Sequence, residues 1–338
     1  MKLRSASRVG NHATPWLGLA LFSLVYLFPA ESSYGFLKRT RFAPEPAATE
    51  KETITLVQIY LDEKMFGPGK IDGRLGQFTR SAVAHYNFGF GLEEDDWGRV
   101  IRESKKGNKK AYAEYILRDS DFNFISIVPF EPENQAKVPY LSYRTPLEFV
   151  AERFHTDEKF LKEINPSTNW TSIAPGDAIV VPNVTPFRIE DVEGSRSFKR
   201  TDGLSGRLVI IDTTQKLAAI WDEEVLVATF PITPGREKFI HRGKWKIQTM
   251  VTTPEFRWDK AMLETGERSE EYYQLPPGPN SPVGILWAGL DKKGIGLHGT
   301  ASPHTIGRSQ SAGCVRFANW DAIRLSSLIR PGATVEIR

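Results

Sequence analysis

The spacing of hydrophobic positions changes several times along this chain. Between residues 52 and 92 they recur at helical intervals, first from Ile54 to Leu61 and again from Thr79 to Phe88. A glycine-dense stretch, 66–76, separates the two and indicates a turn. We therefore predict a small all-α unit over residues 52–92.

A second pattern, over residues 137–184, predicts a β-α-α-β unit. Its predicted elements are a strand at 140–143, a helix from Thr145 to about His155, a helix from Thr156 to Asn165 and a strand at 178–181. The first helix opens with a capping box, Thr145-Pro146-Leu147-Glu148, with proline at its first position. His155, at the end of that helix, is interpreted as a surface or capping residue.

The stretch between these units, 93–136, is predicted to be a connector. Glu103 to Lys110 is a charge run that indicates a solvated loop, and Phe122 to Phe130 alternates as a strand does. No functional interpretation follows from this stretch.

From about residue 205 the pattern is typical of β-structure. Predicted strands lie at 207–212, 216–222, 225–231, 244–249, 285–288, 294–298 and 334–337. A helix over 320–329, capped by Asn319, precedes the last of these strands. The polar segment 254–284 is long enough to predict a functional or disordered loop. The predicted fold class is multidomain: a small all-α domain, a β-α-α-β module and a mainly-β (α+β) domain over 205–338.

The N-terminal segment differs from the rest of the chain. Three cations precede an apolar run, 16–30, which predicts a signal peptide or signal anchor over residues 1–35. The run is shorter than the roughly 20 apolar residues of a spanning helix. Residues 36–51, rich in Pro, Ala and charged side chains, are predicted to be a linker.

Composition narrows the class of protein. Hydrophobic residues make up 40% of the chain and charged residues 25%, as in globular proteins. The formal net charge of +3 comes from the three cations of residues 1–30, so the charge balance gives no case for nucleic-acid binding. The single cysteine, Cys314, cannot form an intramolecular disulfide.

The surroundings of Cys314 favour a reactive thiol over inert packing. His298 ends a predicted strand sixteen residues earlier, and Cys314 follows Gly313 in a tight turn. A thiol needs a base because the thiolate is the nucleophile, and histidine is the usual partner. Backbone N–H groups around Gly313 can hold an oxyanion. Together these groups suit acyl transfer through a thioester.

Residues 205–338 closely resemble the L,D-transpeptidase (YkuD) catalytic domain. The family pattern is His-Gly-Thr followed, after a gap, by Ser/Thr-x-Gly-Cys-hydrophobic-Arg/Asn. Here it reads His298-Gly299-Thr300 and Ser311-Ala312-Gly313-Cys314-Val315-Arg316. Gly278 to Gly284 and Asn319-x-Asp321 match other family segments. Many members have histidine where this chain has Ala312.

The resemblance implies a role for each motif residue. Cys314 is the nucleophile, His298 the base and then the acid, and the Gly299 carbonyl orients the imidazole. Ala312, Gly313 and Cys314 supply the oxyanion N–H groups, and Arg316 and Ser311 contact substrate. It implies crosslinking of stem peptides between two third-position residues, with no cofactor and no metal. The segment 254–284 lies where the family often carries a lid, and Trp287 is interpreted as a strand residue more readily than a substrate contact.

Two further resemblances concern the N-terminal units. Residues 52–92 are similar to a peptidoglycan-binding helical domain through Gly69, Asp72, Gly73, Gly76, Thr79 and Ala82, residues that equally well shape a turn. Residues 137–184 resemble a LysM module through Leu147, Ala151, Phe154, Leu161, Asn165-Pro166, Pro175-Gly176-Asp177 and Val181-Pro182. These resemblances imply peptidoglycan glycan as a partner. The segment predicted as a signal over 1–35 indicates export, to the periplasm or cell envelope of a bacterium. The oligomeric state stays open.

Several alternatives remain at this stage. The same thioester, resolved by water or by a protein amine, makes the enzyme an L,D-carboxypeptidase or a protein-to-wall transferase. A non-catalytic peptidoglycan-binding scaffold is an alternative of another class. A zinc hydrolase using His298, His304, Cys314 and His241 ranks low, because their spacing matches no common metal motif.

Overall fold

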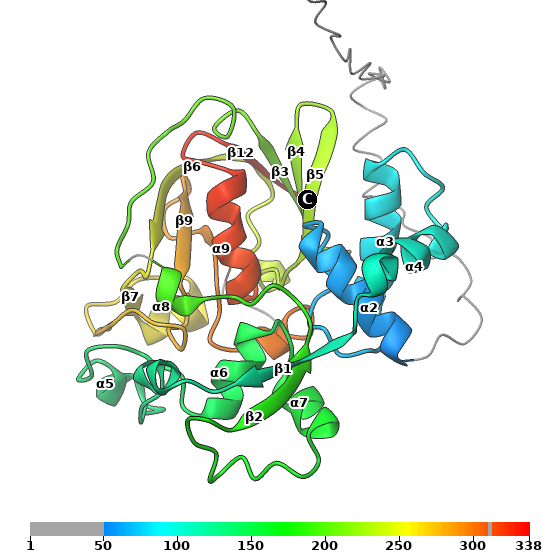
Figure 1. Ribbon diagram of the computed structural model, residues 1–338. Helices are drawn as coiled ribbons and strands as arrows, with labels where there is room; N and C mark the ends of the chain where they lie inside the picture. The colour runs from blue at the N-terminus through cyan, green and yellow to red at the C-terminus, as the bar shows by residue number, and fades with distance from the viewer. Residues whose placement is uncertain (1–50, 193, 310–312) are drawn as a thin grey trace, which may run out of the picture.

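The computed structural model describes residues 51–192, 194–309 and 313–338 (Figure 1). The signal or anchor predicted over 1–35 and the linker predicted over 36–51 lie outside these residues, apart from Lys51, the first residue of α2. Across the described ranges, no helix combines the length and apolar character needed to cross a membrane.

The N-terminal unit is helical. It contains α2 (Lys51–Glu63), α3 (Gln77–Gly89) and α4 (Trp97–Ser104). The first two helices are those predicted from the periodicity, whereas α4 lies in the stretch predicted to be a connector. Val100 of α4 is buried in the same apolar cluster as Val57 and Leu61 of α2, so α4 belongs to this helical unit.

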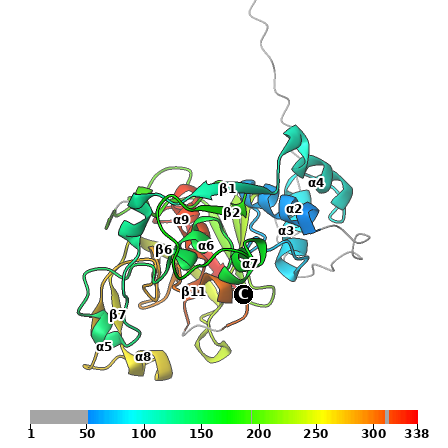
Figure 2. The ribbon, with the colours of Figure 1, turned by 60° about the horizontal axis from the view of Figure 1, so that its bottom comes forward.

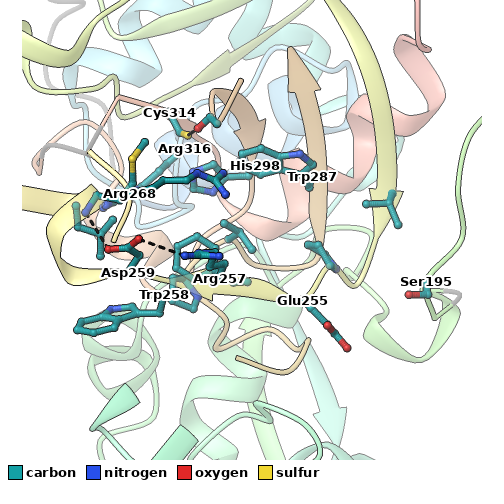
Figure 3. A pocket seen from close by; sticks show the side chains of 18 residues that line it. Ser195, Glu255, Arg257, Trp258, Asp259, Arg268, Trp287, His298, Cys314 and Arg316 are labelled. Carbon is teal, nitrogen blue, oxygen red and sulfur yellow. Dashed lines mark hydrogen bonds and ion pairs between the residues drawn. The ribbon is translucent and has the colours of Figure 1, made fainter. Parts of the chain in front are cut away.

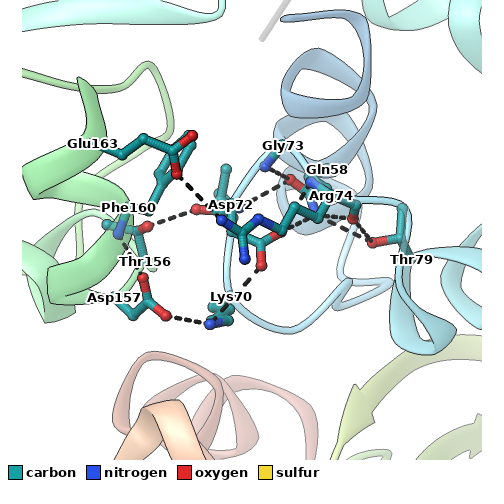
Figure 4. A network of polar contacts seen from close by, with 11 residues as sticks. Gln58, Lys70, Asp72, Gly73, Arg74, Thr79, Thr156, Asp157, Phe160 and Glu163 are labelled. Atoms are coloured by element: carbon teal, nitrogen blue, oxygen red, sulfur yellow. Dashed lines mark hydrogen bonds and ion pairs between the residues drawn. The ribbon is translucent and has the colours of Figure 1, made fainter. Parts of the chain in front are cut away.

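The glycine-dense turn between α2 and α3 is held by one buried amide (Figure 4). The Gln58 Oε1 atom accepts from the N–H groups of Asp72 and Gly73, at 3.0 and 2.8 Å. Its Nε2 donates to Asp72 Oδ1 and Thr79 Oγ1, both at 3.1 Å. Gly73 has a φ of +64°, in the left-handed region that favours glycine. These motif residues therefore have a structural role that needs no ligand.

The β-α-α-β unit forms, but from a different first strand. Its elements are β1 (Tyr112–Ile116), α6 (Pro146–Arg153), α7 (Glu158–Ile164) and β2 (Ala178–Pro182), with β1 antiparallel to β2. The strand predicted at 140–143 is wrong: Tyr143 forms only an isolated bridge, with Ile125. Thr145 caps α6 as predicted, its side chain accepting from Glu148 N–H at 3.0 Å.

The strand predicted over 122–130 is also wrong. Residues Asp119–Phe124 form a 3₁₀ helix instead. The Asp121 carboxylate accepts from the N–H and the guanidinium of Arg118, which favours a turn over an extended chain. The alternation that suggested a strand includes Ile127, which is 95% exposed, so it marks no buried face.

The C-terminal unit is built on one eight-stranded sheet of order β11-β10-β9-β6-β12-β3-β4-β5. The strands are β3 (Leu208–Asp212), β4 (Leu217–Asp222), β5 (Val225–Pro231), β6 (Gly243–Thr252), β9 (Leu286–Leu290), β10 (Gly296–His298), β11 (Val315–Arg316) and β12 (Thr334–Ile337). The predicted strands of this region are confirmed, with boundaries shifted by a few residues. Helix α9 (Asn319–Leu328) confirms the predicted last helix.

Helices cover both faces of the sheet, as Figure 1 shows. On one face, Val209 and Ile211 share an apolar cluster with Leu325 of α9. On the other, Ile210 and Trp221 pack with residues of α2, α3 and α4. Burial on both faces explains why β3 and β4 read as continuous apolar runs rather than alternating ones.

The long segment 254–284 is structured. It contains β7 (Phe256–Trp258), α8 (Lys260–Thr265) and β8 (Tyr273–Leu275), and β7 pairs with β8 antiparallel. Short helix α5 (Pro132–Gln135) lies beside β8. Figure 2 shows this part at the end of the molecule away from α2, α3 and α4.

His155 connects the units instead of facing solvent. Its side chain is 2% exposed, and its Nδ1 lies 3.0 Å from Asp62 Oδ2 of α2. Its ring stacks on Trp320 of α9, with centroids 5.4 Å apart. Beside it, Thr156 donates to the carbonyl of Ile71 at 2.6 Å. The interpretation of His155 as a surface or capping residue is therefore wrong, because the neighbouring units bury it.

Candidate active site

Strand pairing brings four residues considered in the sequence analysis onto one face of the sheet: His298, Arg316, Trp287 and Cys314. Parallel pairing of β10 with β11 sets His298 opposite Arg316, and antiparallel pairing with β9 sets His298 opposite Trp287. Cys314 lies two residues before Arg316, so it shares that face because side chains alternate along a strand. Figure 3 shows Cys314, His298, Trp287 and Arg316 gathered at one side of a pocket.

His298 is held in a defined tautomer. Its Nδ1 lies 2.6 Å from the carbonyl oxygen of Gly299, which can only accept, so Nδ1 carries the hydrogen and Nε2 is the free base. Burial lowers the pKa of His298 to about 3, against the raising effect of that carbonyl. The ring stacks on Trp287 with centroids 5.6 Å apart and planes 23° apart. At neutral pH the imidazole is uncharged and able to accept a proton.

Cys314 is a protonated thiol in the resting site. Its Sγ donates to the carbonyl of Gly294 at 3.5 Å. Burial raises the pKa of the thiol to about 11, and a backbone hydrogen bond from Gly296 and the nearby Arg316 only partly oppose this. A neutral thiol beside a neutral imidazole means that the proton moves to His298 only as the sulfur attacks.

The pocket in front of this pair has a volume of about 600 Å³. Its other wall comes from the segment 254–284, through Phe256, Arg257, Trp258 and Asp259. The side chain of Asp259 caps α8 by accepting from Met262 N–H at 3.1 Å. The predicted lid position is therefore occupied by a hairpin and a helix that line the site.

Arg316 faces the pocket, and no carboxylate among the described residues is recorded as its ion-pair partner. Burial lowers the pKa of its guanidinium, and the sulfur of Cys314 is the neighbour that raises it. A planar cation without a carboxylate partner suits a carboxylate on a bound peptide.

Asn319 is the site residue that sequence reasoning missed. We expected it to cap α9, but Ala318 stands at the cap position and the Asn319 side chain points into the protein core. Its Oδ1 accepts from Thr300 N–H at 3.1 Å and from Ile285 N–H at 3.4 Å. Trp287 was also undervalued, since its apolar strand context hid its place beside His298. Asn319 was noted only as a helix cap and as part of a family-like segment, and nothing in the sequence indicates these contacts.

The structure gives different outcomes for the remaining predicted residues. Ser311 and Ala312 lie outside the described residues. Gly313 directly precedes Cys314, with a φ of +111° that favours glycine. His304 lines other cavities, and the described residues contain no group of three His, Cys, Asp or Glu side chains placed to hold a metal. The zinc hydrolase alternative therefore has no support in this site.

Comparison with known proteins matches the C-terminal unit to one family. Residues 206–337 match the L,D-transpeptidase catalytic domain, YkuD. A protein of Bacillus licheniformis named as an L,D-transpeptidase, YkuD, is 28% identical over 196 residues, which cover 56% of this chain and 92% of the relative. A YkuD protein of Bacillus subtilis, named likewise, is 27% identical over 196 residues with the same coverage.

Solved structures were also compared. L,D-transpeptidase 3 from Mycobacterium tuberculosis is 12% identical, covers 49% of this chain and 76% of its own, and gives a TM-score of 0.33. The catalytic domain of the Enterococcus faecium L,D-transpeptidase is 14% identical, covers 40% of this chain and 98% of its own, and gives a TM-score of 0.29.

Proposed function

Because residues 206–337 form a YkuD-type L,D-transpeptidase catalytic domain, we propose that this cysteine-dependent transpeptidase crosslinks peptidoglycan stem peptides through a thioester on Cys314. One observation carries the proposal. The pairing of β10 with β11 places the free base of His298 on the same face as the Cys314 thiol, at the mouth of a pocket. Nucleophile, base and orienting carbonyl are the parts that acyl transfer needs.

In the first half-reaction, Cys314 Sγ attacks the carbonyl carbon between the third residue and the terminal D-alanine of a donor stem. The thiol proton passes to His298 Nε2 as the sulfur–carbon bond forms. Collapse of the tetrahedral intermediate breaks the carbon–nitrogen bond, and His298 returns the proton to the departing amine. Backbone N–H groups of Gly313 and Cys314 would stabilise the oxyanion, together with Ala312.

In the second half-reaction, the side-chain amine of an acceptor stem attacks the thioester. His298 takes a proton from that amine and gives it to the departing sulfur of Cys314, so the free enzyme is restored. Water in place of the amine yields trimmed stems, and a protein amine yields a protein joined to the wall. Arg316, unpaired by any described carboxylate, would hold a substrate carboxylate beside the reacting bond.

Mass spectrometry tests the thioester. The wild-type chain, incubated with a carbapenem, is expected to gain one adduct, and a Cys314→Ala variant none. His298→Ala should slow adduct formation by about 10²–10³-fold while leaving the unfolding temperature near that of the wild type. An adduct on the Cys314→Ala variant would refute the assignment. Muropeptide products from the wild type then distinguish crosslinking from trimming.

We also propose that the protein is exported and that the units before residue 205 hold it on the wall. The basic and apolar segment within 1–35 supports export, and the likeness of 52–92 and 137–184 to wall-binding modules supports retention. Because Gln58 already occupies the polar groups of the glycine-rich turn, glycan would bind elsewhere on these units. The Cys314→Ala variant should still sediment with purified peptidoglycan, and failure to do so would contradict wall binding.

A further inference from the structure

A buried carboxyl group from the β-α-α-β unit reaches into the catalytic unit. Glu152 lies on α6, and its side chain is 4% exposed. Its Oε1 accepts from Asn319 Nδ2 at 3.0 Å and from the Tyr143 hydroxyl at 2.7 Å. Burial raises the pKa of Glu152 to about 8, which these two hydrogen bonds partly oppose. Burying a carboxyl group costs free energy of folding, so the position of Glu152 needs a specific explanation.

The partners of Asn319 define which way its amide points. Both groups beside Nδ2 are acceptors, the Glu152 carboxyl and the carbonyl of Pro279 at 3.2 Å. Both groups beside Oδ1 are donors, the N–H groups of Thr300 and Ile285. Turning the amide over would set donor against donor and acceptor against acceptor. Glu152 therefore helps to keep the Asn319 oxygen directed at the Thr300 N–H.

That N–H belongs to the same peptide group that orients the catalytic base. The peptide joining Gly299 to Thr300 gives its N–H to Asn319 Oδ1 and receives the His298 Nδ1 hydrogen on its carbonyl oxygen. A peptide group is planar, so holding the N–H also holds the carbonyl. The orientation of the His298 tautomer thus depends on Asn319.

The backbone around Asn319 leaves no room for the amide to shift. A Cβ atom added to Gly299 would lie 2.1 Å from Asn319 Oδ1, and one added to Gly284 would lie 2.0 Å from it. Gly284 also has a φ of +58°. Glycine at both positions allows the amide to approach the two backbone segments, so the arrangement is close-packed as well as hydrogen-bonded.

We propose that Glu152 is a positioning residue for His298, acting through Asn319 and the peptide between Gly299 and Thr300. Catalysis in the C-terminal unit then depends on a side chain of the unit before it. This inference rests on the proposed function for its catalytic consequence, but not for its effect on the imidazole itself. Glu152 touches neither Cys314 nor the substrate pocket.

Two substitutions separate the hydrogen bond from the packing. Glu152→Gln keeps an oxygen that accepts from Asn319 and Tyr143, whereas Glu152→Met fills similar space without an acceptor. In the full-length Met variant, we expect the maximal rate of carbapenem acylation to fall about tenfold, since an orienting hydrogen bond is lost. The half-saturating concentration should stay unchanged, and Gln should restore the rate to within about threefold of wild type.

Nitrogen NMR of the His298 ring reports which ring nitrogen carries the hydrogen. A loss of stability alone would not change this result. The wild type and the Gln variant should show one tautomer with hydrogen on Nδ1, and the Met variant a mixture of both. Leu147→Ala is the matched control, because Leu147 is buried on the same helix but its apolar side chain cannot hydrogen-bond to Asn319. It should lower the unfolding temperature while keeping the tautomer and the acylation rate.

The outcomes are separable. A Met variant with wild-type acylation and a single Nδ1–H tautomer would overturn the inference. So would a Leu147→Ala control that slows acylation as much as the Met variant does. If the wild type forms no adduct at all, the proposed function fails, while the tautomer measurement still decides whether Glu152 positions His298.

Discussion

The protonation of His298 and Cys314 shapes how the individual side chains react. Burial lowers the pKa of the imidazole to about 3 and raises that of the thiol to about 11, so both are neutral over the physiological range. A thiolate–imidazolium pair of Cys314 and His298 therefore does not form before substrate binds. In the proposed reaction, substrate binding would supply the energy to separate charge, by placing the electrophilic carbonyl beside the sulfur and its oxygen near backbone N–H donors of the protein.

The rate at which the unacylated Cys314 thiol reacts with an electrophile should therefore depend steeply on pH. Only the thiolate reacts with iodoacetamide, and its fraction grows about tenfold per pH unit below the pKa of the thiol. We expect the alkylation rate, followed by intact mass, to rise from pH 7 to pH 10 without a plateau. The Cys314→Ala variant controls for alkylation elsewhere. A plateau below pH 8 would instead indicate a preformed thiolate.

Among the helices, α9 is where the other units meet. The Arg324 guanidinium contacts Asp62 of α2 at 2.6 Å and Asp321 of its own helix at 3.3 Å. Although burial alone would raise the pKa of Asp62, Arg324 and His155 hold it below its usual range. Helix α9 begins at Asn319, so these contacts also hold the residue that orients the site.

Removing the cation at this junction should destabilise the protein. Arg324→Met leaves Asp62 and Asp321 buried without a guanidinium, which we expect to cost about 3–5 kcal/mol of unfolding free energy. Arg242→Met is the control, because its pair with Glu237 is exposed and screened by solvent, so its loss should be much smaller. Denaturant unfolding of both variants measures the difference. Equal losses of unfolding free energy in the two variants would show that the buried ion pairs stabilise the protein no more than the exposed pair does.

Prediction of the elements succeeded where one physical signal dominated. Strands β3 and β4 were found because a strand buried on both faces of a sheet requires a long apolar run. Strand β1 was missed because Tyr112–Ile116 is only partly buried and carries Glu114, a weak pattern. The strand predicted over 122–130 failed because the hydrogen bonds of Asp121 outweighed the alternation of its neighbours.

Across the protein as a whole, buried carboxyl groups and histidines give opposite pH dependences. Glu152 and Asp321, whose pKa values burial raises to about 8, bind more protons when folded. Their contribution is complete below their unfolded pKa values and is lost as the pH rises to about 8. His85 and His298, whose pKa values burial lowers to about 4 and 3, act the other way and lose their contribution as the pH falls below 6.5.

Above pH 6.5 only the carboxyl effect of these four groups remains, so stability should fall from pH 6.5 to pH 8.5. Glu152→Gln removes one titrating group, and its loss of unfolding temperature over that interval should be smaller than that of the wild type. Calorimetry at the two pH values measures both. An equal loss in the two proteins would show that Glu152 does not titrate on unfolding.

By itself, the sequence predicted a nucleophile and a base, and it identified the family of the C-terminal unit and most of its strands. These features depend on residues close together in the chain. The motifs around Cys314 and His298 are local, and a run of consecutive apolar side chains indicates a buried strand. Only the tertiary structure showed which groups Glu152, Asn319, His155 and Trp287 contact. Each acts through a partner brought close by folding, and Glu152 and Asn319 are 167 residues apart in the chain. Contacts of that kind leave no periodic or local signal in the sequence.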